Sequence, residues 1–237
     1  MKKIIFMFLF ALPSGVFASD YSNFKGSDLK SIKYFVKDLT KIVGSSTLYS
    51  ARAIGFGGFS VSYKFSYIIK PYEEDSVFYE KNSVYGINYM QVETGLPYRI
   101  DTFLRAGGND GFNVIGGGVR YGLRNVTDEL YKVNMILSLN SHMGLYKDFY
   151  IVDYGTQLSF SMKLTSSLIP FISAGIDSSK LNIKSNNDSS LIGKNVYQSI
   201  ARYTAGLRLR YNWINLSMAY DIYERNDGFN ASLGVRF

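Results

Sequence analysis

The last nine residues, Phe229 to Phe237, read FNASLGVRF. Alternate positions of this segment differ in polarity, because Phe229, Ala231, Leu233, Val235 and Phe237 are apolar and the residues between them are polar or small. Successive side chains of an extended strand point to opposite faces. The segment therefore predicts a strand with an apolar environment on one side and a polar one on the other.

The same period of two extends back through the chain. Its clearest instance is FSVSYKFSYII at Phe59–Ile69, in which apolar residues alternate with Ser60, Ser62, Lys64 and Ser66. Nine further strands are predicted near Val84–Thr94, Arg99–Gly107, Phe112–Arg124, Tyr131–Asn140, Asp148–Lys163, Leu168–Asp177, Ser199–Tyr211, Trp213–Glu224 and Phe229–Phe237. Ten is an even number, which places both ends of an up-and-down barrel on the same side of a membrane.

The connections between these strands differ in length at the two ends of the barrel. If the Phe59–Ile69 strand runs outward, the two longest connections, Pro71–Ser83 and Ser178–Gln198, both lie outside. The inner connections, such as Gly95–Tyr98 and Leu164–Ser167, are short. Long polar outer loops and short inner turns are typical of transmembrane β-barrels. A soluble β-sandwich would also show alternation, but it does not account for an apolar and aromatic face on nearly every strand.

The closing strand, with its alternation and its terminal aromatic, resembles the last strand of Gram-negative outer-membrane β-barrels. This resemblance implies a closed up-and-down antiparallel transmembrane β-barrel of about ten strands, located in the outer membrane and surrounded by its lipid. It also implies that the insertion machinery reads a signal formed by Phe229, Leu233, Val235 and Phe237. Two stretches, SSTLYSARAIGFGGF at Ser45–Phe59 and GGGVRYGL at Gly116–Leu123, are similar to those of a family of small outer-membrane proteins with an N-terminal helical segment.

The first residues have the three parts of a secretory signal peptide: Lys2 and Lys3, an apolar run over Ile4–Leu12, and small residues up to Ala18. We expect cleavage after about Ala18, the alternative being an uncleaved anchor. The apolar run is far shorter than the roughly 18–20 residues of a membrane-spanning helix. The chain thus divides into a signal at 1–18, an N-terminal segment at 19–52 and a barrel at 53–237.

A short amphipathic helix is predicted at Asp28–Val43. Leu29, Ile32 and Val36 recur at helical spacing, and Gly44 follows as a C-terminal glycine. Three positions are open to this helix: a plug in the barrel mouth, a cap against the periplasmic rim, or a contact with a partner.

The polar face of the predicted strands should line the lumen. It carries eleven cations and four anions: Lys64, Arg99, Arg105, Arg120, Arg124, Lys132, Lys163, Arg202, Arg208, Arg210 and Arg236, with Asp101, Asp153, Asp177 and Asp221. Such a lumen either favours a small anionic solute or closes through arginine and aspartate pairs. Ten strands leave a narrow interior. The first hypothesis is therefore a narrow channel or small-solute transporter, and the alternative is a structural or surface-binding barrel with an occluded lumen. Glycines at Gly116, Gly118 and Gly122 either make room for the helix or a solute, or ease strand curvature.

Several other classes of function are not expected. The chain has no cysteine, so it has no disulfide, no thiolate metal site and no lipid-bearing cysteine. Its net charge of +7, or +5 after the signal leaves, belongs to an exported chain with scattered basic residues, so nucleic acid is not expected as a partner. The single histidine, His142, is placed at the outer rim and lacks the partners of a catalytic site, so no enzymatic activity is expected. No cofactor or metal is predicted, because GNDG at Gly108–Gly111 and ERNDG at Glu224–Gly228 indicate turns rather than calcium loops.

Overall fold

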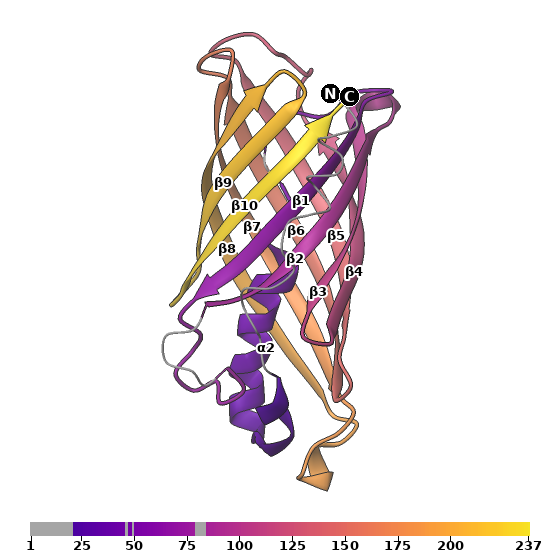
Figure 1. Ribbon diagram of the computed structural model, residues 1–237, viewed down its shortest axis with the longest axis vertical. Helices are drawn as coiled ribbons and strands as arrows, with labels where there is room; N and C mark the ends of the chain where they lie inside the picture. The colour runs from indigo at the N-terminus through magenta and orange to yellow at the C-terminus, as the bar shows by residue number, and fades with distance from the viewer. Residues whose placement is uncertain (1–20, 46, 49, 79–83) are drawn as a thin grey trace.

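The protein forms one closed antiparallel barrel in which each strand pairs with its neighbours in chain order and β1 pairs with β10 (Figure 1). The computed structural model describes residues 21–237 except 46, 49 and 79–83, so the predicted signal peptide lies outside the described residues. The strands are β1 (Phe59–Ile69), β2 (Val84–Gly95), β3 (Ile100–Asn109), β4 (Phe112–Gly122), β5 (Val133–Leu145), β6 (Phe149–Met162), β7 (Leu168–Ile183), β8 (Asn195–Tyr211), β9 (Ile214–Ile222) and β10 (Asp227–Arg236). The predicted fold class is confirmed.

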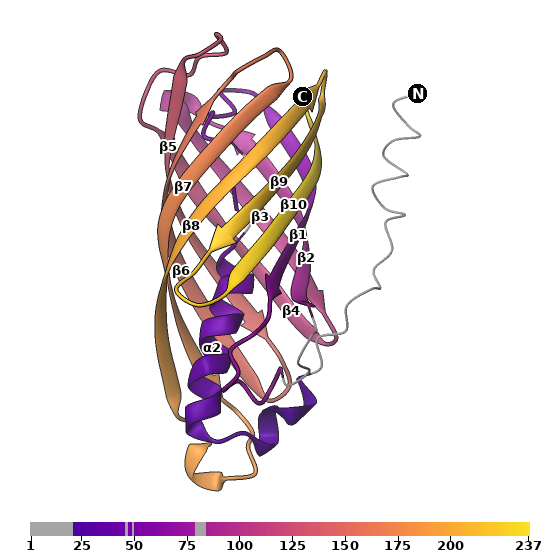
Figure 2. The same cartoon turned by 90° about the vertical axis from the view of Figure 1, so that its left-hand side faces the viewer.

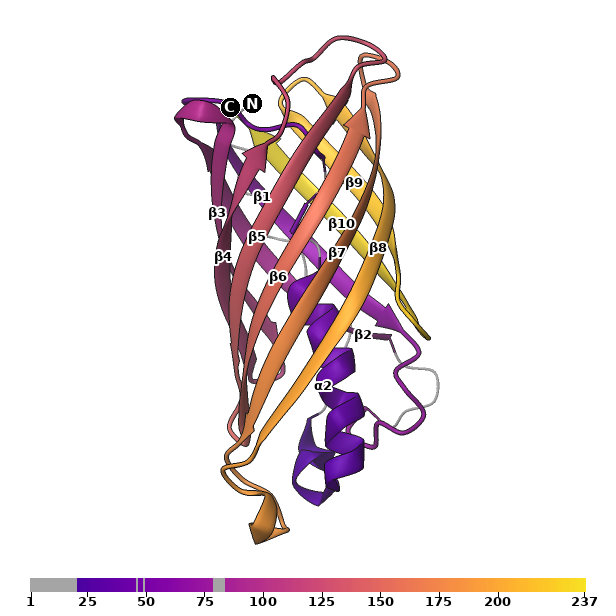
Figure 3. The same cartoon turned by 180° about the vertical axis from the view of Figure 1, so that it is seen from behind.

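The largest difference from the predicted strands is in β7 and β8. They contain 16 and 17 residues, whereas a membrane crossing needs about 9–11. Both are longer than predicted at the same end, so the predicted connection Ser178–Gln198 shortens to residues 184–194. Their hairpin projects beyond the rest of the barrel (Figures 1 and 3).

The two ends of the barrel are distinguished by their connections. One end, which we call the turn end, holds the chain terminus, where the main chains of Phe59 and Phe237 exchange hydrogen bonds of 3.2 and 2.8 Å that close the barrel. The other, the loop end, carries the connections at 70–83 and 184–194. It also carries the predicted GNDG turn, in which Asp110 and Gly111 have φ of 47° and 80°, as a two-residue hairpin requires.

The N-terminal helix α2 (Leu29–Gly44) enters the barrel at the loop end (Figures 1 and 2). It follows a short 3-10 helix, η1 (Ser22–Gly26), and is capped by the Asp28 carboxylate, which accepts a hydrogen bond from Ser31 N at 2.8 Å. It contacts six strands, β1, β2, β5, β6, β7 and β8. Of the three positions open from the sequence, the structure therefore shows the plug. No helix among the described residues is long and apolar enough to cross a membrane.

The helix buries a complete apolar face against the barrel wall, η1 and the connection at 70–78. Six of its side chains are 0% exposed: Ile32, Phe35, Val36, Leu39, Ile42 and Val43. The barrel wall around them is also apolar. The inward residues of a single strand are therefore apolar beside the helix and polar in the turn half of the lumen. On β2, Gln91 and Glu93 face the turn half of the lumen, while Tyr85 and Ile87 join the apolar core around the helix.

The outer face of the barrel is apolar. Leu104 is 73% exposed, and Ile115, Leu139 and Ile172 are exposed on neighbouring parts of the wall. A continuous apolar surface of this kind exceeds what soluble proteins expose and suits contact with lipid. Within the proposed insertion signal, Phe229 and Phe237 are exposed, Leu233 is partly exposed and Val235 is buried; their reading by the insertion machinery stays a prediction.

Candidate functional site in the lumen

Most of the predicted lumen residues do lie inside the barrel. Eight are at most 4% exposed: Lys64, Asp101, Arg105, Arg120, Asp153, Arg202, Arg208 and Asp221. Asp177, also assigned inward from its parity, is buried with them. The strands thus bring a dense set of charges into a space of low dielectric, where each charge needs a partner.

Four predicted lumen residues lie outside the strands, at the turn end, and one of them is Lys163, which follows the end of β6 and pairs with Asp128. Arg99 precedes β3 with a left-handed φ of 64° and donates to the Tyr121 hydroxyl at 3.1 Å. Arg124 follows the end of β4 and is exposed, and Lys132 precedes β5 and pairs with Glu129 on the surface. The prediction was wrong for these residues because alternation fixes a side chain's direction only inside a strand.

The chain that follows α2 runs through the lumen, and the buried cations bind its main chain. Arg105 donates from Nη1 to the Ser45 carbonyl at 2.7 Å and from Nη2 to the Val43 carbonyl. Lys64 donates to the Thr47 carbonyl at 3.3 Å. Helix ends leave carbonyls unsatisfied and carry partial negative charge, so basic side chains are their natural partners.

A second layer lies nearer the turn end. Arg120 binds the Thr47 carbonyl and pairs with Glu93, with Nη1 to Oε2 at 3.0 Å. Gln91 also donates to the Thr47 carbonyl, at 3.3 Å. Further along, the Asp101 carboxylate accepts from Ile54 N at 2.7 Å. Side chains of the wall thus bind the main chain at Val43, Ser45, Thr47 and Ile54.

A third set of charges pairs across the wall itself. Arg202 Nη2 lies 3.2 Å from the Asp177 carboxylate, and Asp177 also contacts the end of α2 at Gly44. Arg208 donates to Asn215, and the Asp221 carboxylate accepts from Thr204 at 2.6 Å. Of these contacts, the one between Arg202 and Asp177 is an arginine–aspartate pair of the kind that the sequence offered as one of two outcomes.

His142 is not the rim residue that the sequence suggested. Its side chain is buried inside the barrel, with Nδ1 3.4 Å from Asp153, whose other oxygen accepts from Ser179 at 2.7 Å. The ring occupies space that Gly116 leaves free, because a Cβ there would come within 2.1 Å of it. The glycine thus makes room for a neighbouring side chain rather than for the helix or a solute. Among the described residues, no group of three or more metal-ligating side chains is assembled.

Sequence reasoning missed a buried ionic contact at the loop end. The Asp38 carboxylate on α2 forms an ion pair with Lys41 at 2.9 Å. It also accepts hydrogen bonds from Tyr72 N at 2.8 Å and from Asn226 Nδ2 at 3.4 Å. One carboxylate therefore joins the helix to the β1–β2 and β9–β10 connections. Lys41 lies off the apolar spacing of the helix, and the loops that bury it cannot be predicted from the local sequence pattern. We call Asp38, Lys41, Tyr72, Asp75 and Asn226 the loop-end latch.

The latch contains carboxyl groups whose ionisation is unfavourable. Burial raises the pKa of Asp38 despite its pairing with Lys41, and burial lowers the pKa of Lys41. Burial and the neighbouring Asp38 raise the pKa of Asp75 well above its usual range. Asp75 nonetheless accepts backbone hydrogen bonds from Val77 and Phe78, which fold the loop over the helix.

Glu93 was also missed, although the sequence contained a signal for it. On β2 the inward series Tyr85, Ile87, Tyr89, Gln91 and Glu93 mixes apolar and polar residues, so no single parity looked polar. The helix explains the mixture, because the inward residues of β2 beside the helix are apolar and those in the turn half of the lumen are polar.

These features define the class: a closed up-and-down transmembrane β-barrel of ten strands with an N-terminal helix held in its lumen.

No protein-family model and no curated protein matches the sequence. Solved structures of outer-membrane proteins align with the chain. The N-terminal barrel domain of Pseudomonas aeruginosa OprF has 14% identity and a TM-score of 0.37, covering 77% of this chain and 99% of that one. The KdgM porin, in complex with disordered oligogalacturonate, has 8% identity and a TM-score of 0.41, covering 75% and 99%. Ail of Yersinia pestis has 16% identity and a TM-score of 0.29, covering 76% and 97%.

Proposed function

We propose that this protein is an outer-membrane barrel closed by its own N-terminal helix, with a structural or surface-binding role carried by its loop end. The observation that carries the proposal is the set of six helix side chains that are 0% exposed where α2 packs against the barrel wall, η1 and the 70–78 connection. Fully burying one such side chain contributes roughly 1.5–3 kcal/mol. Withdrawal of the whole helix is therefore costly, and the closed form is the resting state.

The polar contacts support the same proposal. A helix with its side chains is about 10–12 Å across, and the interior of a ten-stranded barrel is narrow. Beyond the C-terminal end of the helix, Arg105 and Arg120 bind the carbonyl groups of Ser45 and Thr47 instead of facing an open passage. The cations that would select an anionic solute are engaged in holding the plug.

The proposed orientation places the turn end in the periplasm and the loop end outside the cell. The C-terminal end of β10 and the short connections at 96–99, 163–167 and 212–213 then lie on the periplasmic side, as is usual for barrels of this kind. The outer surface would consist of η1, the start of α2, the 70–78 connection and the β7–β8 hairpin. Because Asp38 fixes two of the loops to the helix, this surface is ordered enough to present a constant face to a partner.

Conductance in planar lipid bilayers tests the proposal. The mature full-length protein should be silent, and a variant with Val36→Asn and Leu39→Asn should show openings, because these changes put amide groups into the apolar core of the plug. Gel mobility before and after heating checks that both proteins are folded barrels. Steady current through the unmodified protein would contradict the closed state.

A second candidate function is a gated channel for small anions. It is favoured by the way Lys64, Arg105 and Arg120 bind main-chain carbonyls of an irregular segment, since helix withdrawal would release all three cations together. A variant lacking residues 19–44 should then pass an anion-selective current. Arg120→Gln with Arg208→Gln should reduce that selectivity, and unchanged selectivity would remove this candidate.

A further inference from the structure

Cations outnumber anions at the turn end of the barrel. The Asp128 carboxylate lies 3.1 Å from Arg52 Nη1, 2.9 Å from Arg210 Nη2 and 3.3 Å from Lys163 Nζ. Arg210 binds it with both terminal nitrogens, since Nη1 also donates at 3.1 Å. One negative charge thus meets three positive ones.

A further cation comes from β10, which is separated from β8 by β9 alone. Arg236, near the end of β10, donates from Nη2 to the carbonyls of Ala53 and Ile54, at 3.2 and 2.6 Å. Carbonyl groups are neutral, so these bonds orient the guanidinium without balancing its charge.

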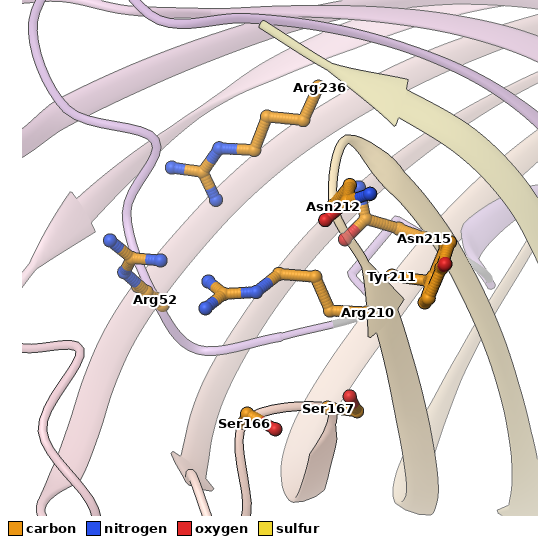
Figure 4. A pocket seen from close by; sticks show the side chains of 8 residues that line it. All are labelled: Arg52, Ser166, Ser167, Arg210, Tyr211, Asn212, Asn215 and Arg236. Atoms are coloured by element: carbon orange, nitrogen blue, oxygen red, sulfur yellow. The ribbon is translucent and has the colours of Figure 1, made fainter.

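These arginines line a pocket of about 430 Å³. Figure 4 shows the guanidinium groups of Arg52, Arg210 and Arg236 directed toward the same region from three different parts of the chain. The remaining walls come from Ser166, Ser167, Tyr211, Asn212 and Asn215. A pocket of this volume is within the range that small-molecule ligands occupy.

The arginines that line the pocket repel one another, and one of them has a buried nitrogen without a hydrogen-bond partner in the described part of the chain. Nε of Arg52 is buried and has no hydrogen-bond partner among the described residues. Burial and the charge of Arg236 lower the pKa of Arg52, Asp128 opposes the change, and Arg210 adds to it. An anion bound between the guanidiniums would relieve this repulsion.

We propose that this pocket binds a small phosphate-bearing molecule from the aqueous phase at the turn end. A phosphate group offers about two negative charges and three strong acceptor oxygens, and guanidinium groups pair with it through two parallel hydrogen bonds. The Ser166 and Ser167 hydroxyls supply neutral donors at the edge. The remaining volume accommodates the group attached to the phosphate.

A lipid phosphate has the same chemistry but lies on the other side of the wall. Arg210 shares the inward parity of the buried Arg208 on β8, and Arg236 shares that of the buried Ser232 on β10. Arg52 belongs to the segment inside the lumen. The pocket therefore faces the interior of the barrel mouth rather than the surrounding lipid.

Calorimetric titration of the full mature chain tests the site, in a phosphate-free glycoside detergent at low salt. The probes are inorganic phosphate and glucose 6-phosphate, with glucose as the uncharged control. Both anions should bind saturably and raise the thermal midpoint of unfolding, whereas glucose should do neither. Arg210→Gln should weaken phosphate binding about tenfold or more, the usual effect of losing a charged hydrogen-bonding partner.

The matched control is Arg124→Gln, which removes an exposed arginine at the same end but outside this pocket. It should leave phosphate affinity within about twofold. Arg210→Lys keeps the charge and loses the planar fork, so it should bind with intermediate affinity; this variant also serves if Arg210→Gln does not fold.

Three results would overturn the proposal. The first is the absence of saturable phosphate binding, and the second is an equal loss of affinity in Arg124→Gln. The third is binding seen only in nanodiscs of phosphatidylglycerol and not displaced by free phosphate, which would assign the site to lipid. None of these results bears on whether the helix closes the lumen, because conductance tests that separately.

Discussion

Arg105 on β3 donates a hydrogen bond to the carbonyl oxygen of Ser45 at 2.7 Å, inside the barrel. Ser45 directly follows α2, so the barrel wall holds the helix by its C-terminal end. Partial negative charge collects at that end of a helix, and a buried guanidinium complements it. The acceptor is a main-chain carbonyl, so the interaction cannot be predicted from the side chain of Ser45.

Arg105→Leu should loosen the plug. The change keeps an apolar side chain in the lumen but leaves the Val43 and Ser45 carbonyls without their donor, at a cost of about 1–3 kcal/mol for each buried group. Hydrogen exchange of the α2 amides, read by mass spectrometry, should accelerate. Arg124→Leu, at an exposed position, is the control, and equal α2 protection in both variants would contradict the role given to Arg105.

Gly44→Ala should also disturb docking of the helix. A Cβ at Gly44 would lie 2.7 Å from Asp177 Cγ, closer than real side chains approach. Overpacking of this kind costs about 1–3 kcal/mol, and here it also pushes on the ion pair between Asp177 and Arg202. The free energy of unfolding, from urea titration in lipid vesicles, should fall by about that amount.

The matched control for this prediction is Gly26→Ala. A Cβ at Gly26 would have no heavy atom within 4 Å, and its backbone lies outside the left-handed region. We expect it to be neutral or slightly stabilising. If the two alanine variants have the same stability, close packing at Gly44 does not matter to the fold.

Much of the barrel was predictable because alternation is a local property. The range of β1 is the predicted one, and most other strands shift by only a few residues. The helix was predictable for the same reason, since Leu29, Ile32 and Val36 repeat at helical spacing. The role of Gly44 differs from the expected one: it does not adopt a positive φ as a C-terminal glycine often does, and instead allows close approach to Asp177.

The candidate site was predictable only in part. Parity placed Arg105, Arg120 and Arg202 in the lumen, but it could not show that Arg105 and Arg120 bind main-chain carbonyls. Those partners depend on the path of residues 43–54, which is set by long-range packing of the helix. Arg52 was not singled out, because it lies in an irregular segment where no periodicity assigns a direction.

The loop-end latch should give stability a dependence on pH. The pKa of Asp75 is raised well above its usual value of 3.8. At a pH between the pKa of Asp75 in the unfolded chain and its higher pKa in the folded protein, the folded protein keeps a proton that the unfolded chain has lost. The free energy of unfolding therefore falls as the pH rises through that range, by up to about 1.4 kcal/mol per pH unit. Urea titrations from about pH 4 upward measure this slope.

Asp75→Asn should flatten that dependence and stabilise the protein at neutral pH. The amide oxygen still accepts the backbone hydrogen bonds from Val77 and Phe78, and no proton has to be retained. Glu73→Gln is the control, because Glu73 is exposed in the same connection. A slope that persists in Asp75→Asn would place its origin in another group, such as Asp38.

Asp128 should give a dependence of the opposite sign at the turn end. Partial burial opposes its ionisation, but the hydrogen bonds from Arg210 and the charges of Arg52 and Lys163 lower the pKa of Asp128 to about 2. The unfolded chain then takes up a proton at higher pH than the folded protein does, so this stabilisation is present above about pH 4 and is lost as the pH falls toward about 2. The Asp128 side chain is 41% exposed, and solvent screening reduces the effect to about 1 kcal/mol or less.

Asp128→Asn should therefore lower the free energy of unfolding at neutral pH and leave it nearly unchanged at pH 2. The asparagine keeps the shape of the side chain but not the charge that balances Arg52, Arg210 and Lys163, which then repel one another. Asp110→Asn makes the same substitution at an exposed hairpin of the loop end and should be neutral at both values. If the difference in unfolding free energy between wild type and Asp128→Asn stays the same across this pH range, the negative charge of Asp128 does not stabilise the fold, and the excess of positive charge inferred around it at the turn end would be contradicted.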